Sequence, residues 1–285
     1  MLFAIKTPSG RDPLQVATAT QNMTQAITEW SPKAKARLAG VFEALEGFTS
    51  TFGQVTVLGR LLVVGNASTT AANILQHETL FRWGFASSLL AVAFHLGWGF
   101  LFYQLFRPVN RSVSFCAVLV ILIVCALQAV TALLYLAPLL VLTAGSSLSA
   151  LTQEQLEALA YMFLKLNGLA FDTDLVFFGL WCVLTGYLIF RSTFLPRILG
   201  VLLAIDGLGW TTYMWPPLGH SLFPAIAVAC GLAEIPLQLW LLIFGVNNER
   251  WKAQAEGIER ANSSQTDRAG AEPANHGPIR LPLFL

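Results

Sequence analysis

Seven ionisable residues fall inside long apolar stretches of this 285-residue chain, where side chains of this kind are uncommon. They are Glu43, Glu46, His95, Asp172, Asp174, Asp206 and Glu234. A charged side chain at the centre of a bilayer costs about 2.5–3.5 kcal/mol, so six ionised, lipid-facing carboxylates would cost on the order of 15 kcal/mol. The acids must therefore be protonated, line a wet interior, or share a cation.

These residues are expected to lie at different depths. Their heights above the nearest cytoplasmic basic residues, counted at 1.5 Å per residue, range from about 9 Å for Glu43 to about 28 Å for Asp172. Such a ladder is typical of a proton or cation path, with gaps that water can bridge. The alternative is that each side chain forms a hydrogen bond with a different neighbouring helix. All seven are kept as candidates for a substrate or proton pathway, and no catalytic residue is assigned.

Local spacing refines the expected chemistry. Glu43 and Glu46 share one helix face, whereas Asp172 and Asp174 point apart and do not form a two-carboxylate metal site. Lys165, seven residues before Asp172 on the same stripe, is expected to ease the burial of that acid. Glu234 precedes Pro236 by two residues, and this proline leaves a carbonyl without its helical donor, as in the broken helices that bind cations or protons.

His95 lies on a stripe of small residues, Gly84, Ser88, Ala91 and Gly99, which indicates close helix packing. A second such stripe, formed by Gly200, Ala204, Gly207 and Thr211, lies beside Asp206.

No cofactor is predicted, because the chain contains no nucleotide-binding loop, metalloprotease motif, hydrolase elbow or dinucleotide fingerprint. The four cysteines lie in apolar stretches and form no CxxC pair, which argues against disulfides and zinc ribbons. They are Cys116, Cys125, Cys182 and Cys230. Metal binding stays open, since His95 would need carboxylates to complete a site.

Composition identifies the class of element that must position these groups. Apolar residues make up 55% of the chain and charged residues 12%, with a mean hydropathy of +0.62. A soluble domain is about 25% charged, so these values exclude an ordinary aqueous globule. The net charge of +1 gives no basic excess for a nucleic-acid partner.

Six membrane helices are expected, each near the 20 residues that a span requires. Three lie between the basic pairs Arg37 and Arg60, Arg82 and Arg107, and Lys165 and Arg191. Another, the third in chain order, covers about 113–142, and the stretch between Arg197 and Arg250 holds two more, separated at Trp215–His220. The predicted fold is an all-α transmembrane bundle over residues 36–247.

Positive charges orient the bundle. With both ends in the cytoplasm, 14 Lys and Arg residues lie inside and three, Arg60, Arg82 and Lys165, lie outside. Residues 1–35 then form a cytoplasmic amino-terminal tail, and the polar residues 248–285 form a disordered cytoplasmic tail. In the outer loop between the third and fourth spans, Thr152 and Gln155 match a capping box that predicts a helix leading into the fourth span.

Several short motifs occur in an order that resembles a family of bacterial multi-spanning proteins, domain of unknown function 4386. They include Ala36–Gly40, Thr70–Leu75, Leu80–Arg82, Arg107–Arg111, Leu175–Leu180, Gly186–Ser192, Leu195–Gly200 and Gly231–Glu234. The resemblance covers about residues 34–247 and implies a membrane bundle in the inner membrane, with no established activity. Against the family pattern, Glu234 fits, whereas Ser88, His95, Asn167 and Asp206 replace residues of other types.

Three functions are compatible with the sequence. The leading hypothesis is an integral membrane protein with a polar acidic interior that transports a small solute or ion with protons. The first alternative is a non-catalytic protein that docks a membrane partner through its small-residue faces. The second is an intramembrane enzyme that uses His95, Asp174 and Glu234, which requires these three residues to converge.

Overall fold

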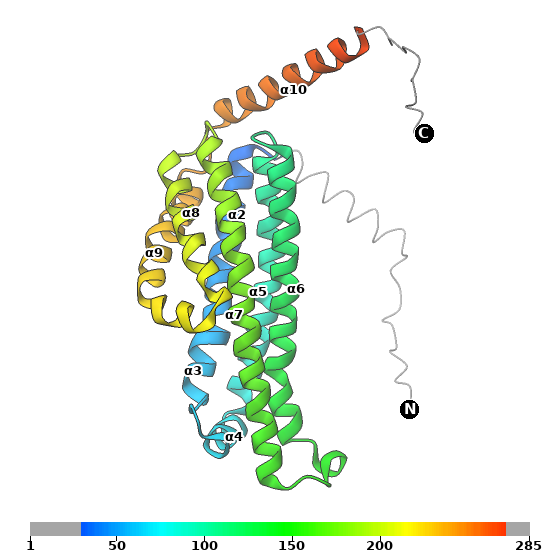
Figure 1. The fold of residues 1–285 in the computed structure, drawn as a ribbon, viewed down its shortest axis with the longest axis vertical. Helices are drawn as coiled ribbons and strands as arrows, with labels where there is room; N and C mark the ends of the chain where they lie inside the picture. Colours follow the sequence, from blue (N-terminus) through cyan, green and yellow to red (C-terminus); the bar gives the residue numbers. More distant parts are fainter. Residues whose placement is uncertain (1–29, 272–285) are drawn as a thin grey trace, which may run out of the picture.

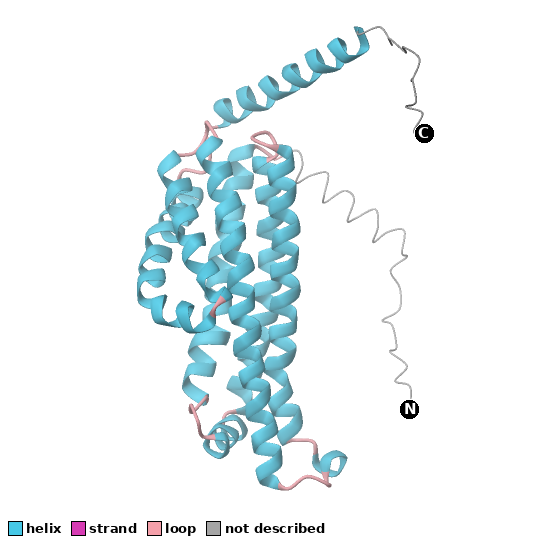
Figure 2. Ribbon diagram, viewed as in Figure 1, coloured by secondary structure: helices cyan, strands magenta, loops and turns pink. Residues whose placement is uncertain are grey.

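A computed structural model describes residues 30–271 of the chain and shows that this part is built from helices joined by short turns (Figure 2). The long helices are α5 (Glu78–Phe106), α6 (Arg111–Leu142), α7 (Gln153–Arg191) and α9 (Pro216–Ile243). The shorter ones are α2 (Pro32–Ser50), α3 (Leu58–Leu61), α4 (Ala67–Gln76), α8 (Arg197–Thr211) and α10 (Asn248–Ala271). The π-helical η1 (Thr51–Val57) and the 3₁₀ turns η2 (Gly145–Leu148) and η3 (Thr212–Met214) complete the set.

Within the described residues, α5, α6, α7 and α9 are long and apolar enough to cross a membrane. Many of their large apolar side chains point outward, among them Leu119, Leu122 and Leu133 of α6. A soluble monomer rarely exposes apolar patches of this extent. The all-α prediction is confirmed, and the chain is a multi-pass membrane protein with at least these four candidate spans.

The two other expected spans have a different form. The first, from Arg37 to Arg60, lies in an uninterrupted helical path through α2, η1 and α3, in which Glu43 and Glu46 lower the hydropathy. The fifth is α8, whose 15 residues extend about 22 Å, less than the hydrocarbon core of about 30 Å. In Figure 1, α8 and α9 cover only part of the length of α7, and the η3 turn that joins them lies partway along it.

Local sequence signals place the helix ends. Ser31 and Pro32 begin α2, because the Ser31 hydroxyl accepts from the Ala34 amide at 3.2 Å. Asn110 caps α6 in the same way. The predicted capping box of Thr152 and Gln155 is confirmed, and the helix that it starts is continuous with the membrane span, which gives α7 its 39 residues.

The predicted disorder beyond Asn247 is wrong for residues 248–271, which form α10. Polarity suggested disorder, but Ala, Glu, Lys and Arg are good helix formers, and specific contacts anchor the helix. The Trp251 indole Nε1 donates to the Leu105 carbonyl at 2.8 Å, and Gln254 Oε1 accepts from the Thr193 amide at 3.0 Å. The expectations for residues 1–29 and 272–285 lie outside the described residues.

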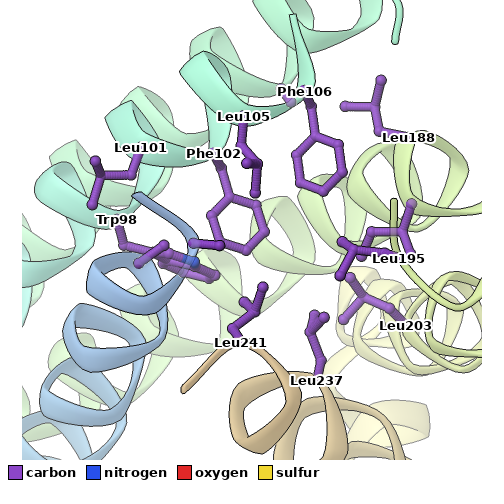
Figure 3. Close-up of a cluster of buried hydrophobic side chains, with 14 of the residues drawn as sticks. Trp98, Leu101, Phe102, Leu105, Phe106, Leu188, Leu195, Leu203, Leu237 and Leu241 are labelled. Carbon is purple, nitrogen blue, oxygen red and sulfur yellow. The ribbon is translucent and has the colours of Figure 1, made fainter. Parts of the chain in front are cut away.

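One apolar core fills the end of the bundle where α5, α7 and α9 finish. It joins Trp98, Phe102 and Phe106 of α5 to leucines of α7, α8 and α9, as Figure 3 shows. Four glycines bring α7 and α8 into close contact at this end: Gly179 and Gly186 face Gly207 and Gly200. A Cβ on Gly186 would lie 2.6 Å from the Gly200 carbonyl oxygen, so the backbones can approach this closely only without side chains.

Candidate functional site: an acidic cavity in the bundle

Five of the seven sequence-predicted residues line a single cavity of about 540 Å³. Glu46 reaches it from α2, His95 from α5, Asp172 and Asp174 from α7, and Glu234 from α9. Helical counting left open which way these side chains face, and the structure brings them to one space. Side chains two positions apart on a helix point in different directions. Asp172 and Asp174 nevertheless both reach the cavity, because it extends along α7 from α2 to α9.

A glutamine connects two of these groups. The His95 Nδ1 lies 3.3 Å from Gln128 Oε1, and Gln128 Nε2 donates to Glu46 Oε1 at 3.4 Å. An ionised Glu46 only accepts hydrogen bonds, so Gln128 presents its amide nitrogen to Glu46 and its oxygen to His95. His95 then carries its proton on Nδ1, and its buried Nε2, which has no hydrogen-bond partner, is left as an acceptor.

The opposite side of the cavity reaches the surface near the η3 turn. His220 Nε2 lies 3.0 Å from Asp172 Oδ2, and the side chain of His220 is 61% exposed, against 15% for Asp172. The Tyr213 ring packs edge-on against His220, with centroids 5.2 Å apart. This histidine–aspartate pair therefore lies at one accessible edge of the cavity, and the exposed side chains of Val55 and Phe223 line other parts of its rim.

The expectation that Lys165 eases the burial of Asp172 is wrong. The Lys165 Nζ lies 5.3 Å from the centre of the Tyr161 ring, and Asp172 pairs with His220 instead. Side chains on a helix tilt toward its amino terminus, so Lys165 reaches back to Tyr161 rather than forward to Asp172.

Glu43 and Asp206 do not line the cavity and lie buried behind it. Glu43 is 9% exposed and interacts electrostatically with Glu234 and Glu46. Asp206 is fully buried in α8, close to Glu234 and to Cys182 of α7. The seven candidates thus form one connected region, with five in contact with the cavity and two behind its wall.

The walls combine acids with aromatic rings. Phe171, Phe178, Trp210, Tyr213 and Phe223 line the cavity beside the carboxyl groups. Among its described lining residues are four carboxyl groups and two histidines, and no Lys or Arg is present. A cavity of this composition favours a ligand that is positively charged and partly apolar.

Stacked rings separate the cavity from the apolar core. The His95 and Trp98 ring centres lie 4.7 Å apart, and Trp98 contacts Trp181 at 4.5 Å. Phe178 stacks on Trp181 at 6.1 Å. Beyond these rings the packing is apolar, so the cavity is closed toward the carboxyl-terminal ends of α5 and α7.

Two residues of the site were missed by the sequence reasoning. Gln128 was passed over because only ionisable groups were considered. An amide within the apolar stretch 113–142 is also unfavourable to bury without hydrogen-bond partners, and this was the signal in the sequence. His220 was assigned to a helix stop at Trp215–His220. The stop is confirmed between η3 and α9, but His220 itself belongs to the first turns of α9 and faces Asp172.

The intramembrane-enzyme alternative requires His95, Asp174 and Glu234 to converge. All three line the cavity, but the polar contacts of His95 in the described structure are with Gln128 and, at 3.7 Å, with Glu46. The Asp174 carboxyl forms its side-chain hydrogen bond with Gln128, and the Glu234 carboxyl interacts with Asp206 and Cys230. The arrangement therefore shows no histidine oriented by an acid of this trio.

A family model described as "Domain of unknown function (DUF4386)" matches residues 38–245. The chain belongs to this family. The DUF4386 match extends from α2 to just beyond α9, so all residues that line the cavity fall within it. No curated protein and no solved structure matches the chain.

Proposed function

We propose that this DUF4386 protein crosses the bacterial cytoplasmic membrane six times, with both ends in the cytoplasm, and that its cavity carries a small cationic solute in exchange with protons. The observation that carries the proposal is the convergence of Glu46, Asp172, Asp174 and Glu234 on one cavity without a Lys or Arg in its lining.

The outward faces of α2 and α8 support six spans. On α8, Ile198, Val201, Ile205 and Leu208 recur at helical spacing and are all at least 39% exposed. Val41, Leu45 and Phe48 form a similar outward stripe on α2. Exposed apolar stripes of this kind suit contact with lipid, so both helices belong beside the four long ones in the bilayer.

The chemistry follows from the charge of the lining. A buried carboxylate must be neutralised by a proton or by a cation, and one group seldom holds both. A solute cation that enters beside Glu46 and Glu234 therefore displaces protons, and protons that return displace the solute. Aromatic faces such as Phe178 and Trp210 add cation–π attraction for an organic cation.

The cavity is closed on the side of the apolar core, and this indicates which parts must move during transport. The His220–Asp172 pair lies on an accessible side of the cavity, whereas the rings of Trp98 and Trp181 block the side toward the apolar core. Transport requires this ring layer to open while the outer side closes. Because α9 contains Pro224 and Pro236, and proline removes helical hydrogen bonds, α9 is the element expected to move.

The test uses the full chain in proteoliposomes that contain a pH-sensitive dye. Addition of a panel of inorganic and primary-amine cations should release protons for at least one of them, and Glu234→Gln should lower that flux by at least about tenfold, a loss of about 1.4 kcal/mol of coupling. The matched control is Glu249→Gln on exposed α10, which should retain wild-type flux. Proton flux that is independent of every cation, or unchanged by Glu234→Gln, would contradict the proposal.

A further inference from the structure

A thiol and two carboxyl groups from three different helices meet behind the cavity wall. They are Cys182 of α7, Asp206 of α8 and Glu234 of α9, and each offers a ligand atom within 4.8 Å of the other two. Cys182 and Asp206 are fully buried, and Glu234 is partly buried at the edge of the cavity.

Asp206 supplies a second observation that points to a ligand. Both of its carboxyl oxygens are buried and lack a partner of regular hydrogen-bond geometry, as does Glu234 Oε1. The Asp206 carboxyl interacts instead with the Glu234 carboxyl and the Trp210 indole. Two buried carboxyl groups in contact cannot both be ionised unless a positive charge lies between them. The trio contains a cysteine and two acids and no cationic side chain, so a bound cation would supply that charge.

We propose that Cys182, Asp206 and Glu234 bind a divalent transition metal ion of the zinc class, through one sulfur and two oxygen ligands. A thiolate disfavours Ca²⁺ and Mg²⁺, which prefer oxygen ligands, and suits Zn²⁺ or Co²⁺. In a tetrahedral zinc site with these ligands, the donor atoms are separated by about 3.4–3.6 Å. The observed separations, within 4.8 Å, require side-chain adjustments of about 1 Å or less.

The scaffold holds two of the ligands in place. Gly207, next to Asp206, packs so closely on α7 that a Cβ there would lie 2.8 Å from the Cys182 Cβ and 2.5 Å from the Gly179 carbonyl oxygen. This contact fixes Cys182 and Asp206 relative to each other. Glu234 completes the trio from the cavity side, so the cavity provides the entry path for the ion.

Binding is linked to proton release. The Cys182 thiol must lose its proton to coordinate the metal, as must any carboxyl that holds one, and these protons leave to solvent as the metal enters. The alternative explanation of the cluster is that Asp206 and Glu234 share a proton and bind no metal.

The test measures binding to the purified full chain in detergent, after treatment with a chelator. Titration with Co²⁺ should produce a thiolate-to-cobalt charge-transfer absorption that saturates at one ion per chain, and Zn²⁺ should displace it. Cys182→Ser should abolish this absorption, and Asp206→Asn should weaken Co²⁺ binding by at least about tenfold. The matched control Cys125→Ser, at a buried cysteine of α6 outside the trio, should bind as the wild type does.

X-ray absorption at the zinc edge of the wild-type protein gives a readout that does not depend on the folding of variants, and one sulfur ligand is expected. An absence of charge-transfer absorption in the wild type, or binding unaffected by both Cys182→Ser and Asp206→Asn, would overturn the metal site in favour of a shared proton. Because this binding is measured without flux, its outcome is independent of the transport proposal.

Discussion

Gln128 lies at the centre of the polar contacts in the cavity, although it carries no charge. Its amide contacts the His95 imidazole on one side and the Glu46 carboxyl on the other. The two ends of an amide differ, one accepting and one donating, and this asymmetry fixes the His95 proton on Nδ1 when Glu46 is ionised. A leucine of similar size cannot provide either contact.

Gln128→Leu should therefore destabilise the protein by about 1 kcal/mol, because His95 and Glu46 lose a partner inside the bundle. In detergent this corresponds to a fall in melting temperature of about 2–4 °C. The control Gln76→Leu makes the same change at the exposed end of α4 and should leave the melting temperature within a degree of the wild type. Equal melting temperatures for the two variants would show that the Gln128 contacts contribute nothing to stability.

At the scale of the elements, the crossing of α7 and α8 positions the candidate metal ligands. The crossing depends on glycines that leave no room for a side chain. The stripe through Gly200 and Gly207 was visible in the sequence, because small residues at such spacing mark close packing. Its partners Gly179 and Gly186, seven residues apart on α7, become evident only once the two helices are placed together.

Gly186→Ala should destabilise the bundle by about 1–3 kcal/mol, since the added methyl group would overlap the Gly200 carbonyl and force the helices apart. Gly168→Ala on the same helix is the matched control. Nothing lies within 4 Å of a Cβ at Gly168, and alanine favours a helix by up to about 1 kcal/mol over glycine, so its stability should be unchanged or raised. Melting curves of both variants in detergent distinguish these outcomes, and a Gly186→Ala variant as stable as Gly168→Ala would rule out a tight crossing.

At the scale of the whole molecule, the orientation of the bundle in the membrane decides on which side α10 lies. The α5–α6 turn, the α7–α8 turn and the start of α10 lie at one end of the bundle, and α4 and the α6–α7 loop lie at the other (Figure 1). The starts of α2 and α10 lie together at the end with the basic turns, where the Lys33 amide donates to Asn248 Oδ1. If the basic turns face the cytoplasm, as proposed, α10 lies inside, and in the opposite orientation of the bundle α10 lies outside.

Single-cysteine labelling of intact cells with a membrane-impermeant reagent separates these arrangements, in a background without the four native cysteines. Ser149→Cys in the α6–α7 loop should be labelled from outside. Lys252→Cys in α10 should be labelled only after the membrane is permeabilised, since α10 lies at the same end as the basic turns, which are expected in the cytoplasm. Labelling of Lys252→Cys in intact cells would contradict this orientation, and the parent protein without its four cysteines is the control for unspecific reaction.

The sequence by itself determined the class of the molecule and the identity of its unusual residues. Apolar runs and basic markers are local properties, so they predicted helices at α5, α6, α7 and α9 and identified Glu46, Asp174 and Glu234 as groups inside the membrane region. The helical tail α10 was missed because its anchor is a contact between Trp251 and Leu105, 146 residues apart.

Only the tertiary structure decided which way these groups face. Position along a helix follows from counting residues, but the direction of a side chain around the bundle depends on how each helix is rotated and packed against the others. That packing brought Glu46, His95 and Glu234 to one cavity and placed Asp206 against Cys182 behind it. It also gave Lys165 a partner within its own helix and gave His220, from a predicted turn, a contact with Asp172.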